Sequence, residues 1–315
     1  MINRTAFGPK TTADEVLDGI DMTGQRVLIT GGTSGLGAET ARAMAARGAD
    51  VTITARSARK AADVVADIKT QTGKTVAVEE LELGSMASIR AFAERVNAGG
   101  EKIDVLINNA GIMACPQGQT EDGFETQFGT NHLGHFLMTA LVAQSLKDGG
   151  RVVALSSSAH QMSDVLFDDI DFAKSGYNQW VSYGQSKTAN ALFAIGLNKR
   201  LAARGIEVFS VHPGAIQTGL GRHLSFVDIL KFLPRILFGG IAMKSVQAGA
   251  ATQCYAATAP EIKGQGGRFL ANCGIAPISQ ERVRKDSVVW PYAQNADAAE
   301  RLWTISEEMV GHQFA

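Results

Sequence analysis

A short apolar run that stops abruptly in glycines is the feature that most restricts how this chain can fold. Residues 27–30 read as a buried strand, the next seven are Gly31-Gly-Thr-Ser-Gly-Leu-Gly37, and residues 38–47 carry a helical pattern. A strand, a tight turn and a helix start together present backbone N–H groups and a positive helix end, which bind phosphate. Gly31 would permit the turn, Gly35 would let the backbone approach a pyrophosphate, and Gly37 would let the helix lie close to the sheet. An ordinary glycine turn has the same short pattern, so further residues are needed to distinguish a phosphate-binding loop from a simple turn.

Further apolar runs of strand length follow, with helical segments between them. The predicted strands cover residues 26–30, 50–54, 75–80, 103–108, 151–155, 206–211 and 267–270. Runs such as Val105-Leu-Ile107 do not alternate with polar residues, as expected for strands buried on both faces of a parallel sheet. Strands that alternate with long helices imply right-handed crossovers and a doubly wound α/β sheet. We therefore predict an N-terminal extension over residues 1–23 and one Rossmann-type domain over residues 24–315, with a mostly parallel seven-stranded sheet.

Composition excludes several other functions. The 315 residues carry a net charge of −1 with scattered Lys and Arg, so no basic stripe is available for a nucleic acid. The three cysteines have neither paired nor metal-ligand spacing, as expected for a reduced intracellular protein. The sequence has no run of eighteen apolar residues and no signal-peptide core, so we predict a cytoplasmic protein without a transmembrane span. His132 and His135 lack a third ligand at a suitable spacing, so we predict no metal site.

The end of the second predicted strand distinguishes between dinucleotide cofactors. Folds that bind NAD usually place an acid there, which accepts hydrogen bonds from the ribose hydroxyls. This chain has Ala55 at that point and Arg56 next to it. A carboxylate would repel a 2′-phosphate, whereas Arg56 can hold one in a charge-assisted hydrogen bond of roughly 1.5–3 kcal/mol, so we predict NADP(H). Arg59 and Lys60 can assist, although both also suit a solvated helix face.

The tips of the third and fourth strands add residues to this site. Glu82 could accept a hydrogen bond from the adenine amino group or cap the helix that follows it. Asn109-Ala-Gly111 combines a bridging amide with residues small enough for close backbone approach, although a simple turn reads the same way. The predicted nucleotide site therefore comprises Gly31, Thr33, Ser34, Gly35, Leu36, Gly37, Arg56, Glu82, Leu83, Asn109, Ala110 and Gly111.

A tyrosine and a lysine open the helical pattern that follows the fifth strand. Tyr183 and Lys187 share one helix face, so the lysine cation would favour phenolate and lower the pKa of the tyrosine. Tyr183 would then act as a general acid or base, while Lys187 bonds the nicotinamide ribose. One of the serines 156–158, at the sheet edge where ligands bind, could donate to a substrate carbonyl oxygen. Asn131 lies within a predicted helix over residues 124–146, where an amide is disfavoured unless it bonds a displaced carbonyl or a water.

A Pro-Gly turn ends the sixth predicted strand. Its backbone and a nearby threonine hydroxyl could hold the carboxamide of a nicotinamide, although Pro-Gly is also generic turn chemistry. The predicted contacts at this end of the cofactor are Pro213, Gly214, Ile216 and Thr218, together with Tyr183 and Lys187.

Taken together, these residues resemble the short-chain dehydrogenase/reductase superfamily. The matching marks are Thr30-Gly31-x-x-x-Gly35-x-Gly37, Asn108-Asn-Ala-Gly111, Asn131, Ser157, Tyr183-x-x-x-Lys187 and Pro213-Gly214-x-x-x-Thr218. Segments such as Thr130-Asn-His-Leu-Gly-His-Phe136 and Ala299-Glu-Arg-Leu-Trp303 are similar to its retinol dehydrogenase and WW-domain oxidoreductase branch. The resemblance covers nearly the whole chain. It implies a catalytic tetrad of Asn131, Ser157, Tyr183 and Lys187, and hydride transfer between NADP(H) and an alcohol or carbonyl compound.

Two segments of this branch flank the expected nicotinamide site. The resemblance makes residues 164–181 an extra flap and places a substrate lid near residues 215–245. Residues 224–238 of the lid are mostly apolar, which favours a small apolar substrate. A subunit contact, as in a homo-oligomer, or a membrane-surface helix would have the same pattern.

Other functions share parts of this pattern. A nucleotide-sugar epimerase would have the tyrosine and lysine, but its glycines are spaced Gly-x-x-Gly-x-x-Gly, unlike those here. A non-catalytic NADP(H) sensor commonly loses the tyrosine or the lysine, and both are present in this chain. A light-dependent double-bond reductase of the protochlorophyllide type is a related alternative. We predict an NADP(H)-dependent alcohol dehydrogenase or carbonyl reductase.

Overall fold

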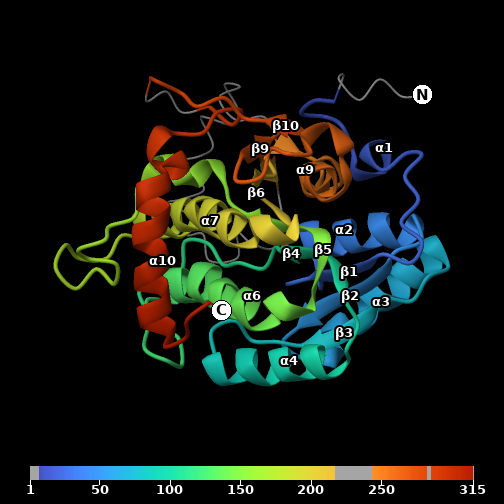
Figure 1. The fold of residues 1–315 in the computed structure, drawn as a ribbon, viewed down its shortest axis with the longest axis horizontal. Coiled ribbons are helices and arrows are strands. Elements are labelled where there is room, and N and C mark those ends of the chain that lie inside the picture. Colours follow the sequence, from blue (N-terminus) through green and yellow to red (C-terminus); the bar gives the residue numbers. More distant parts are fainter. Residues whose placement is uncertain (1–6, 217–242, 282–284, 315) are drawn as a thin grey trace.

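An eight-stranded sheet runs through the middle of the molecule (Figure 1), whose computed structural model describes residues 7–216, 243–281 and 285–314. The strand order is β10-β9-β6-β5-β4-β1-β2-β3. The strands are β1 (Arg26–Ile29), β2 (Asp50–Ala55), β3 (Ala77–Glu80), β4 (Ile103–Asn108), β5 (Leu146–Leu155), β6 (Glu207–His212), β9 (Phe269–Ala271) and β10 (Gly274–Ile275). All neighbours pair in parallel except β10, which is antiparallel to β9. The predicted doubly wound, mostly parallel sheet is confirmed, and the short β10 adds an eighth strand to the predicted seven.

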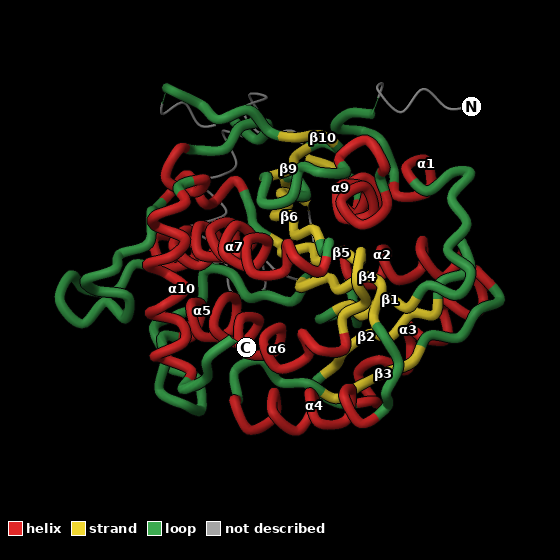
Figure 2. Tube along the Cα trace, in the orientation of Figure 1, coloured by secondary structure: helices red, strands yellow, loops and turns green. Residues whose placement is uncertain are grey.

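Helices cover both faces of the sheet (Figure 2). One apolar core contains residues of α2 (Gly35–Ala46), α3 (Ala58–Thr72) and α9 (Val246–Thr258). The other contains residues of α4 (Met86–Ala98), α6 (Gly134–Val142), α7 (Gln179–Leu201) and α10 (Ala296–Val310). Within β1, Val27 and Ile29 belong to the first core and Leu28 to the second. Because side chains alternate along a strand, burial on both faces explains the unbroken apolar runs in the sequence.

The segment before β1 packs into the first core. Helix α1 (Ala13–Val16) starts with a capping box, in which the Glu15 carboxylate accepts from the Thr12 N–H at 2.7 Å and Thr12 Oγ1 accepts from the Glu15 N–H at 3.3 Å. Leu17 and Met22 are fully buried in the same core. This part of the predicted N-terminal extension is therefore packed as part of the main body.

The C-terminal helix α10 packs against α7. Gly196 of α7 leaves room for the Trp303 indole, because a Cβ at that position would lie 2.7 Å from the ring. Trp303 stacks on Phe193 with ring centroids 5.9 Å apart, and the Arg200 guanidinium lies 3.9 Å from the indole centroid. None of the helices in the described ranges is long and apolar enough to cross a membrane.

The region predicted as one helix over residues 124–146 contains a π-helical turn. Helix α5 (Thr126–Phe128) passes into a π-helical turn, Gly129–Leu133, before α6 begins, and β5 starts at Leu146. The predicted helix is therefore present over residues 126–145, but its hydrogen bonding changes from α-helical to π-helical around Asn131, whose side-chain amide bonds the main chain of Ile112 outside the helix. Single π-helical turns of this kind are frequent at functional sites.

Of the two segments expected over the substrate, the flap 164–181 is among the described residues, whereas most of the lid near residues 215–245 is not. Thr218 and the apolar segment 224–238 lie outside the described residues. The ends of the surrounding chain, β7 (Ala215–Ile216) and β8 (Met243–Lys244), pair with each other in parallel. The predicted flap packs onto the body, since Val165 and Phe172 are buried and the Tyr177 hydroxyl donates to Cys115 O at 2.9 Å.

Candidate active site

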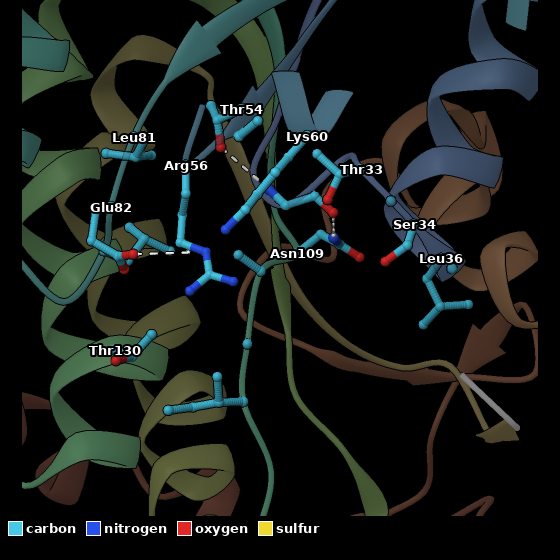
Figure 3. A pocket seen from close by; sticks show the side chains of 18 of the residues that line it. Thr33, Ser34, Leu36, Thr54, Arg56, Lys60, Leu81, Glu82, Asn109 and Thr130 are labelled. Carbon is cyan, nitrogen blue, oxygen red and sulfur yellow. Dashed lines mark hydrogen bonds and ion pairs between the residues drawn. The ribbon is translucent and has the colours of Figure 1, made fainter. Parts of the chain in front are cut away.

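A cleft of about 250 Å³ opens at the carboxyl edge of the sheet (Figure 3). Every nucleotide-site residue predicted between Gly31 and Gly111 lines this cleft. Ala55 and Lys60 line it too, whereas Arg59 is not among the lining residues. Five lining residues were not predicted as site residues, although each adjoins a predicted one or ends a strand: Thr54, Leu81, Ile112, Thr130 and Leu155.

The glycine-rich loop forms the floor of the cleft at the end of β1. Gly31 has φ +68°, and a Cβ there would lie 2.8 Å from the Ala110 Cβ. A Cβ on Gly37 would lie 2.5 Å from Gly31 O, so only glycine lets α2 start this close to the sheet. The N-cap Ser34 makes no side-chain capping bond, and the first turn of α2 carries no acid. The positive end of α2 is therefore available to an anion in the cleft.

Charged side chains gather where β2 and β3 end. Figure 3 shows Arg56 and Lys60 reaching over the cleft, with the Glu82 carboxylate facing the Arg56 guanidinium. Arg56 Nε lies 3.9 Å from Glu82 Oε2, and the Arg56 side chain is 56% exposed. Glu82 is the one carboxylate among the described residues that line the cleft. Because Arg56 and Lys60 lie beside the buried Ala55, this end of the cleft can form charge-assisted hydrogen bonds with a ribose 2′-phosphate, which an unphosphorylated ribose would not use.

Glu82 does not cap helix α4, which was one reading of its sequence position. Its Oε1 accepts from the Gly84 N–H at 3.1 Å. Ser85 is the N-cap of α4 and accepts from the Ser88 N–H at 3.4 Å.

At the end of β4, Asn109 bridges three parts of the chain. Its Nδ2 donates to Thr30 O at 2.8 Å and to Gly31 O at 3.3 Å, and its Oδ1 accepts from Gln253 Nε2 at 3.1 Å. Next to it, Gly111 brings the main chain against the catalytic helix, since a Cβ there would lie 3.5 Å from Lys187 Nζ. The nucleotide cleft and the predicted catalytic residues therefore adjoin.

The predicted catalytic side chains meet at this junction. Tyr183 and Lys187 lie one turn apart on α7 and are only 5% and 3% exposed. Lys187 Nζ lies 5.6 Å from the centre of the Tyr183 ring and donates to Leu155 O at 3.1 Å. The Ser157 side chain hydrogen-bonds to the Tyr183 phenol. The neighbouring Ser156 hydroxyl instead donates to Lys187 O at 2.7 Å.

Burial dominates the acid–base properties of this pair. Burial raises the pKa of the Tyr183 phenol to about 12, and the hydrogen bond from Ser157 offsets only part of that rise. Burial also lowers the pKa of the Lys187 ammonium to about 8. The prediction that Lys187 lowers the pKa of Tyr183 is therefore wrong, because removing the phenolate from water outweighs the attraction of the nearby cation.

Asn131 reaches the same junction from the π-helical turn. Its Oδ1 accepts from the Ile112 N–H at 2.8 Å, and its Nδ2 donates to Ile112 O at 2.9 Å and to Ser186 Oγ at 3.0 Å. These hydrogen bonds account for the buried amide in mid-helix, because it links the main chain of Ile112 to Ser186 of α7. All four residues of the predicted tetrad thus lie around one end of the cleft.

The Pro213-Gly214 turn lies beyond β6. Gly214 has φ +99°, and a Cβ there would lie 2.6 Å from the Lys244 side chain. Ile216 packs close to Leu36 of the glycine-rich loop, since a Cβ on Gly249 would touch both side chains. The described part of this predicted nicotinamide contact therefore lies beside the start of α2.

The two histidines of the π-helical region face different partners. His132 Nε2 lies 2.8 Å from Ser306 Oγ, whereas His135 Nε2 lies 2.9 Å from Thr30 Oγ1. Within the described ranges, no group of three His, Cys, Asp or Glu side chains is placed to hold a metal ion.

Comparison with known proteins identifies the class. A family model for the short chain dehydrogenases matches residues 25–225. Retinol dehydrogenase 12 of Mus musculus is 39% identical over 298 residues, which cover 94% of this chain and 89% of that protein. The chloroplastic short-chain dehydrogenase TIC 32 B of Brassica napus is 36% identical, with coverage of 98% and 95%. The chain belongs to the short-chain dehydrogenase family, a family of oxidoreductases, and within it to the branch of the retinol dehydrogenases.

Solved structures agree with this assignment. An uncharacterized protein from Mycobacterium paratuberculosis has a TM-score of 0.73 and 35% identity, and the match covers 97% of this chain and 99% of that one. A short chain dehydrogenase from Burkholderia cenocepacia, solved in complex with NADP, has a TM-score of 0.62 and 28% identity, with coverage of 79% and 96%.

Proposed function

We propose that this chain is an NADP(H)-dependent oxidoreductase that interconverts an apolar alcohol and its aldehyde or ketone. The observation that carries the proposal is a buried phenol at the inner end of a dinucleotide-type cleft. Tyr183 is hydrogen-bonded by Ser157 and lies close to the Lys187 ammonium. Such a group can exchange a proton with a substrate oxygen at the point where a cofactor ring would end.

Two features of the cleft favour NADP(H) as the cofactor. The start of α2 offers backbone N–H groups and a helix dipole to a pyrophosphate. Arg56 and Lys60 flank the end of β2, where Ala55 replaces the carboxylate that a 2′-phosphate would encounter in a site for NAD. The relative from Burkholderia cenocepacia, solved with NADP, supports the same cofactor.

The proposed mechanism follows from the protonation states. When bound, NADPH supplies a hydride to the carbonyl carbon. Tyr183, whose pKa is raised to about 12, stays protonated at neutral pH and donates its phenolic proton to the carbonyl oxygen. With substrate bound, the Ser157 hydroxyl gives its single hydrogen to this carbonyl oxygen instead of to the Tyr183 phenol, as negative charge develops there. Lys187, with a pKa of about 8, is mainly charged at pH 7 and stabilises the phenolate that remains. Alcohol oxidation runs through the same groups in reverse.

The apolar substrate class rests on the relatives and on the apolar character of the two segments expected over the substrate. Relatives in the same branch are named retinol dehydrogenases, and residues 224–238 are mostly apolar. Burying apolar substrate surface yields about 25 cal/mol per Å², so apolar compounds gain most from such a site. We also propose that the protein works in the cytoplasm and that residues 215–245 contribute to the substrate lid.

A substrate panel tests the proposal. Purified protein is mixed with NADPH or NADH and with aldehydes and ketones of increasing apolar size, or with NADP⁺ and alcohols, and absorbance of the reduced nicotinamide is followed. We expect turnover in the dark, a preference for NADPH, and kcat/KM that climbs with apolar size. A requirement for light and a pigment would favour a double-bond reductase. Tight NADPH binding without turnover of any compound would favour a cofactor sensor.

A further inference from the structure

The cleft segment 109–112 is held at both of its ends by buried side chains. At its start, Thr30 Oγ1 accepts from the N–H groups of its first two residues at 2.9 and 3.0 Å. At its end, the Asn131 amide makes a two-way pair with the main chain of Ile112, at 2.8 and 2.9 Å. The position of this cleft wall therefore depends on Thr30 and Asn131, which come from different parts of the sequence.

His135 connects the two sets of hydrogen bonds, those of Thr30 and those of Asn131, which we call the two clamps of segment 109–112. Its Nδ1 lies 2.9 Å from Asn131 O, and its Nε2 lies 2.9 Å from Thr30 Oγ1. A carbonyl only accepts, so Nδ1 must carry the ring proton of the neutral imidazole. Nε2 then accepts from the Thr30 hydroxyl at 2.9 Å, much closer than the alternative acceptor Ile107 O at 3.5 Å. Both lone pairs of Thr30 Oγ1 remain for the two N–H groups of the segment. Donors and acceptors match throughout this chain of hydrogen bonds.

The imidazole holds this single arrangement because it does not titrate at ordinary pH. His135 is 2% exposed, and burial lowers its pKa to about 4, with a smaller contribution from the nearby Lys187 charge. His132 is the other titratable group that interacts with it. A proton on Nε2 would reverse the bond with Thr30 and make Nε2–H compete with the two segment N–H groups for the lone pairs of Thr30 Oγ1, so the neutral form preserves the arrangement.

The connection continues to the catalytic helix. Asn131 Nδ2 donates to Ser186 Oγ at 3.0 Å, and the Ser186 hydroxyl donates to Tyr183 O at 2.8 Å. We propose that His135 is a positioning residue that locks segment 109–112 against the catalytic helix and so preforms the NADP(H) cleft. This inference rests on the proposed function for the identity of the cofactor, whereas the clamp itself can be measured without it.

The test compares three variants of the whole chain by amide hydrogen exchange and by NADPH titration. His135→Phe replaces the imidazole with a ring of similar size and removes its bonds to Asn131 O and Thr30 Oγ1. Exchange of the Asn109, Ala110 and Ile112 amides should become at least tenfold faster relative to the rest of the sheet. The Kd of this variant for NADPH should rise about tenfold, as expected for one or two lost hydrogen bonds. His132→Phe is the matched control, since His132 is equally buried but bonds Ser306, and it should leave both readouts unchanged.

His135→Asn separates the two clamps and keeps the test decisive if His135→Phe does not fold. Asparagine can still donate to Asn131 O but does not reach Thr30, so exchange should rise at Asn109 and Ala110 and not at Ile112. Equal exchange in the wild type and in the His135 variants, or equal changes at both ends in His135→Asn, would overturn the proposal. If wild-type protein binds no NADPH while the exchange pattern is as expected, the clamp stands and the proposed cofactor is wrong.

Discussion

The two ends of the cleft differ in how their polar groups are held. We call the end with Arg56 and Glu82 the adenosine end, because the proposed NADP(H) would place its adenosine there. These two side chains are 56% and 41% exposed and face each other across 3.9 Å. At the other end, which we call the catalytic end because it holds the proposed tetrad, Tyr183, Lys187 and Asn131 are buried. Lys187 Nζ and Asn131 Nδ2 donate to main-chain oxygens at 3.1 and 2.9 Å. The first end is built from charges in water, and the second from polar groups removed from water.

This difference determines what each end can do. Exposed charges attract a phosphate through a field that salt screens, and changing one of them costs the fold little. Buried groups have shifted pKa values and support chemistry, but their burial costs folding free energy. Substitutions at the catalytic end should therefore change turnover or stability strongly, whereas those at the adenosine end should change cofactor choice alone.

Tyr183→Phe gives the largest expected effect. Phenylalanine keeps the buried ring and removes the only proton donor assigned to the substrate oxygen, so kcat should fall roughly 10²- to 10⁴-fold. The Kd for NADPH, measured by fluorescence titration, should change less than about threefold, because the phenol is buried among protein groups. Ser156→Ala is a matched control at a nearby hydroxyl that bonds Lys187 O. Near-normal kcat in Tyr183→Phe would require a different acid.

Lys187→Met should remove a pH-dependent part of the stability. The Lys187 pKa is about 8 in the folded protein and near 10.5 when exposed. Between these values the unfolded chain binds more protons, so the free energy of unfolding rises with pH. Between pH 7.5 and 10.5 the free energy of unfolding of the wild type should therefore rise by about 3 kcal/mol relative to that of the variant. This value follows from about 1.4 kcal/mol per unit of the pKa difference between the unfolded and folded states.

Denaturant titration of both proteins without NADPH measures that difference. The buried thiol of Cys273 has a pKa raised to about 11, so it lowers stability as pH rises above 9. This contribution is the same in both proteins and cancels in the difference. A difference that stays flat across the window would show that Lys187 titrates as an exposed lysine.

Arg56→Ala should change cofactor choice without changing the fold. The loss of one charge-assisted bond to a 2′-phosphate should raise the Kd for NADPH about 10- to 100-fold, while that for NADH changes little. Lys60→Ala should also raise the Kd for NADPH relative to that for NADH, but by a smaller factor. The ratio of the two Kd values at low and high salt is the measurement, and an unchanged ratio would mean that Arg56 does not meet the 2′-phosphate.

Local patterns in the sequence predicted the residues that line the adenosine end of the cleft. The glycine spacing after β1 and the Ala55-Arg56 pair are short-range signals. The seven predicted strands are all present, and those in the middle of the sheet, such as β4 and β5, carry the uninterrupted apolar runs that specify buried strands. The catalytic end depended on contacts that no local pattern carries. The Asn131 amide bonds the main chain of Ile112, 19 positions away, and the His135 contact with Thr30 joins residues 105 positions apart. The pKa of Tyr183 rose because of burial, which residue spacing does not report.

Glu82→Gln should have the smallest effect and gives the finest test of the contrast. Its carboxylate lies near the Arg56 guanidinium, where it competes with a 2′-phosphate for the cation and repels it. An exposed pair at 3.9 Å is worth at most about 1 kcal/mol, so the preference for NADPH over NADH should rise only two- to fivefold. The rise should fade in high salt because the charges are solvated. Any contact of Glu82 with adenine is common to both cofactors and cancels in the ratio. A loss of NADPH preference would instead mean that Glu82 orients Arg56, and the adenosine end would then depend on fixed geometry as the catalytic end does.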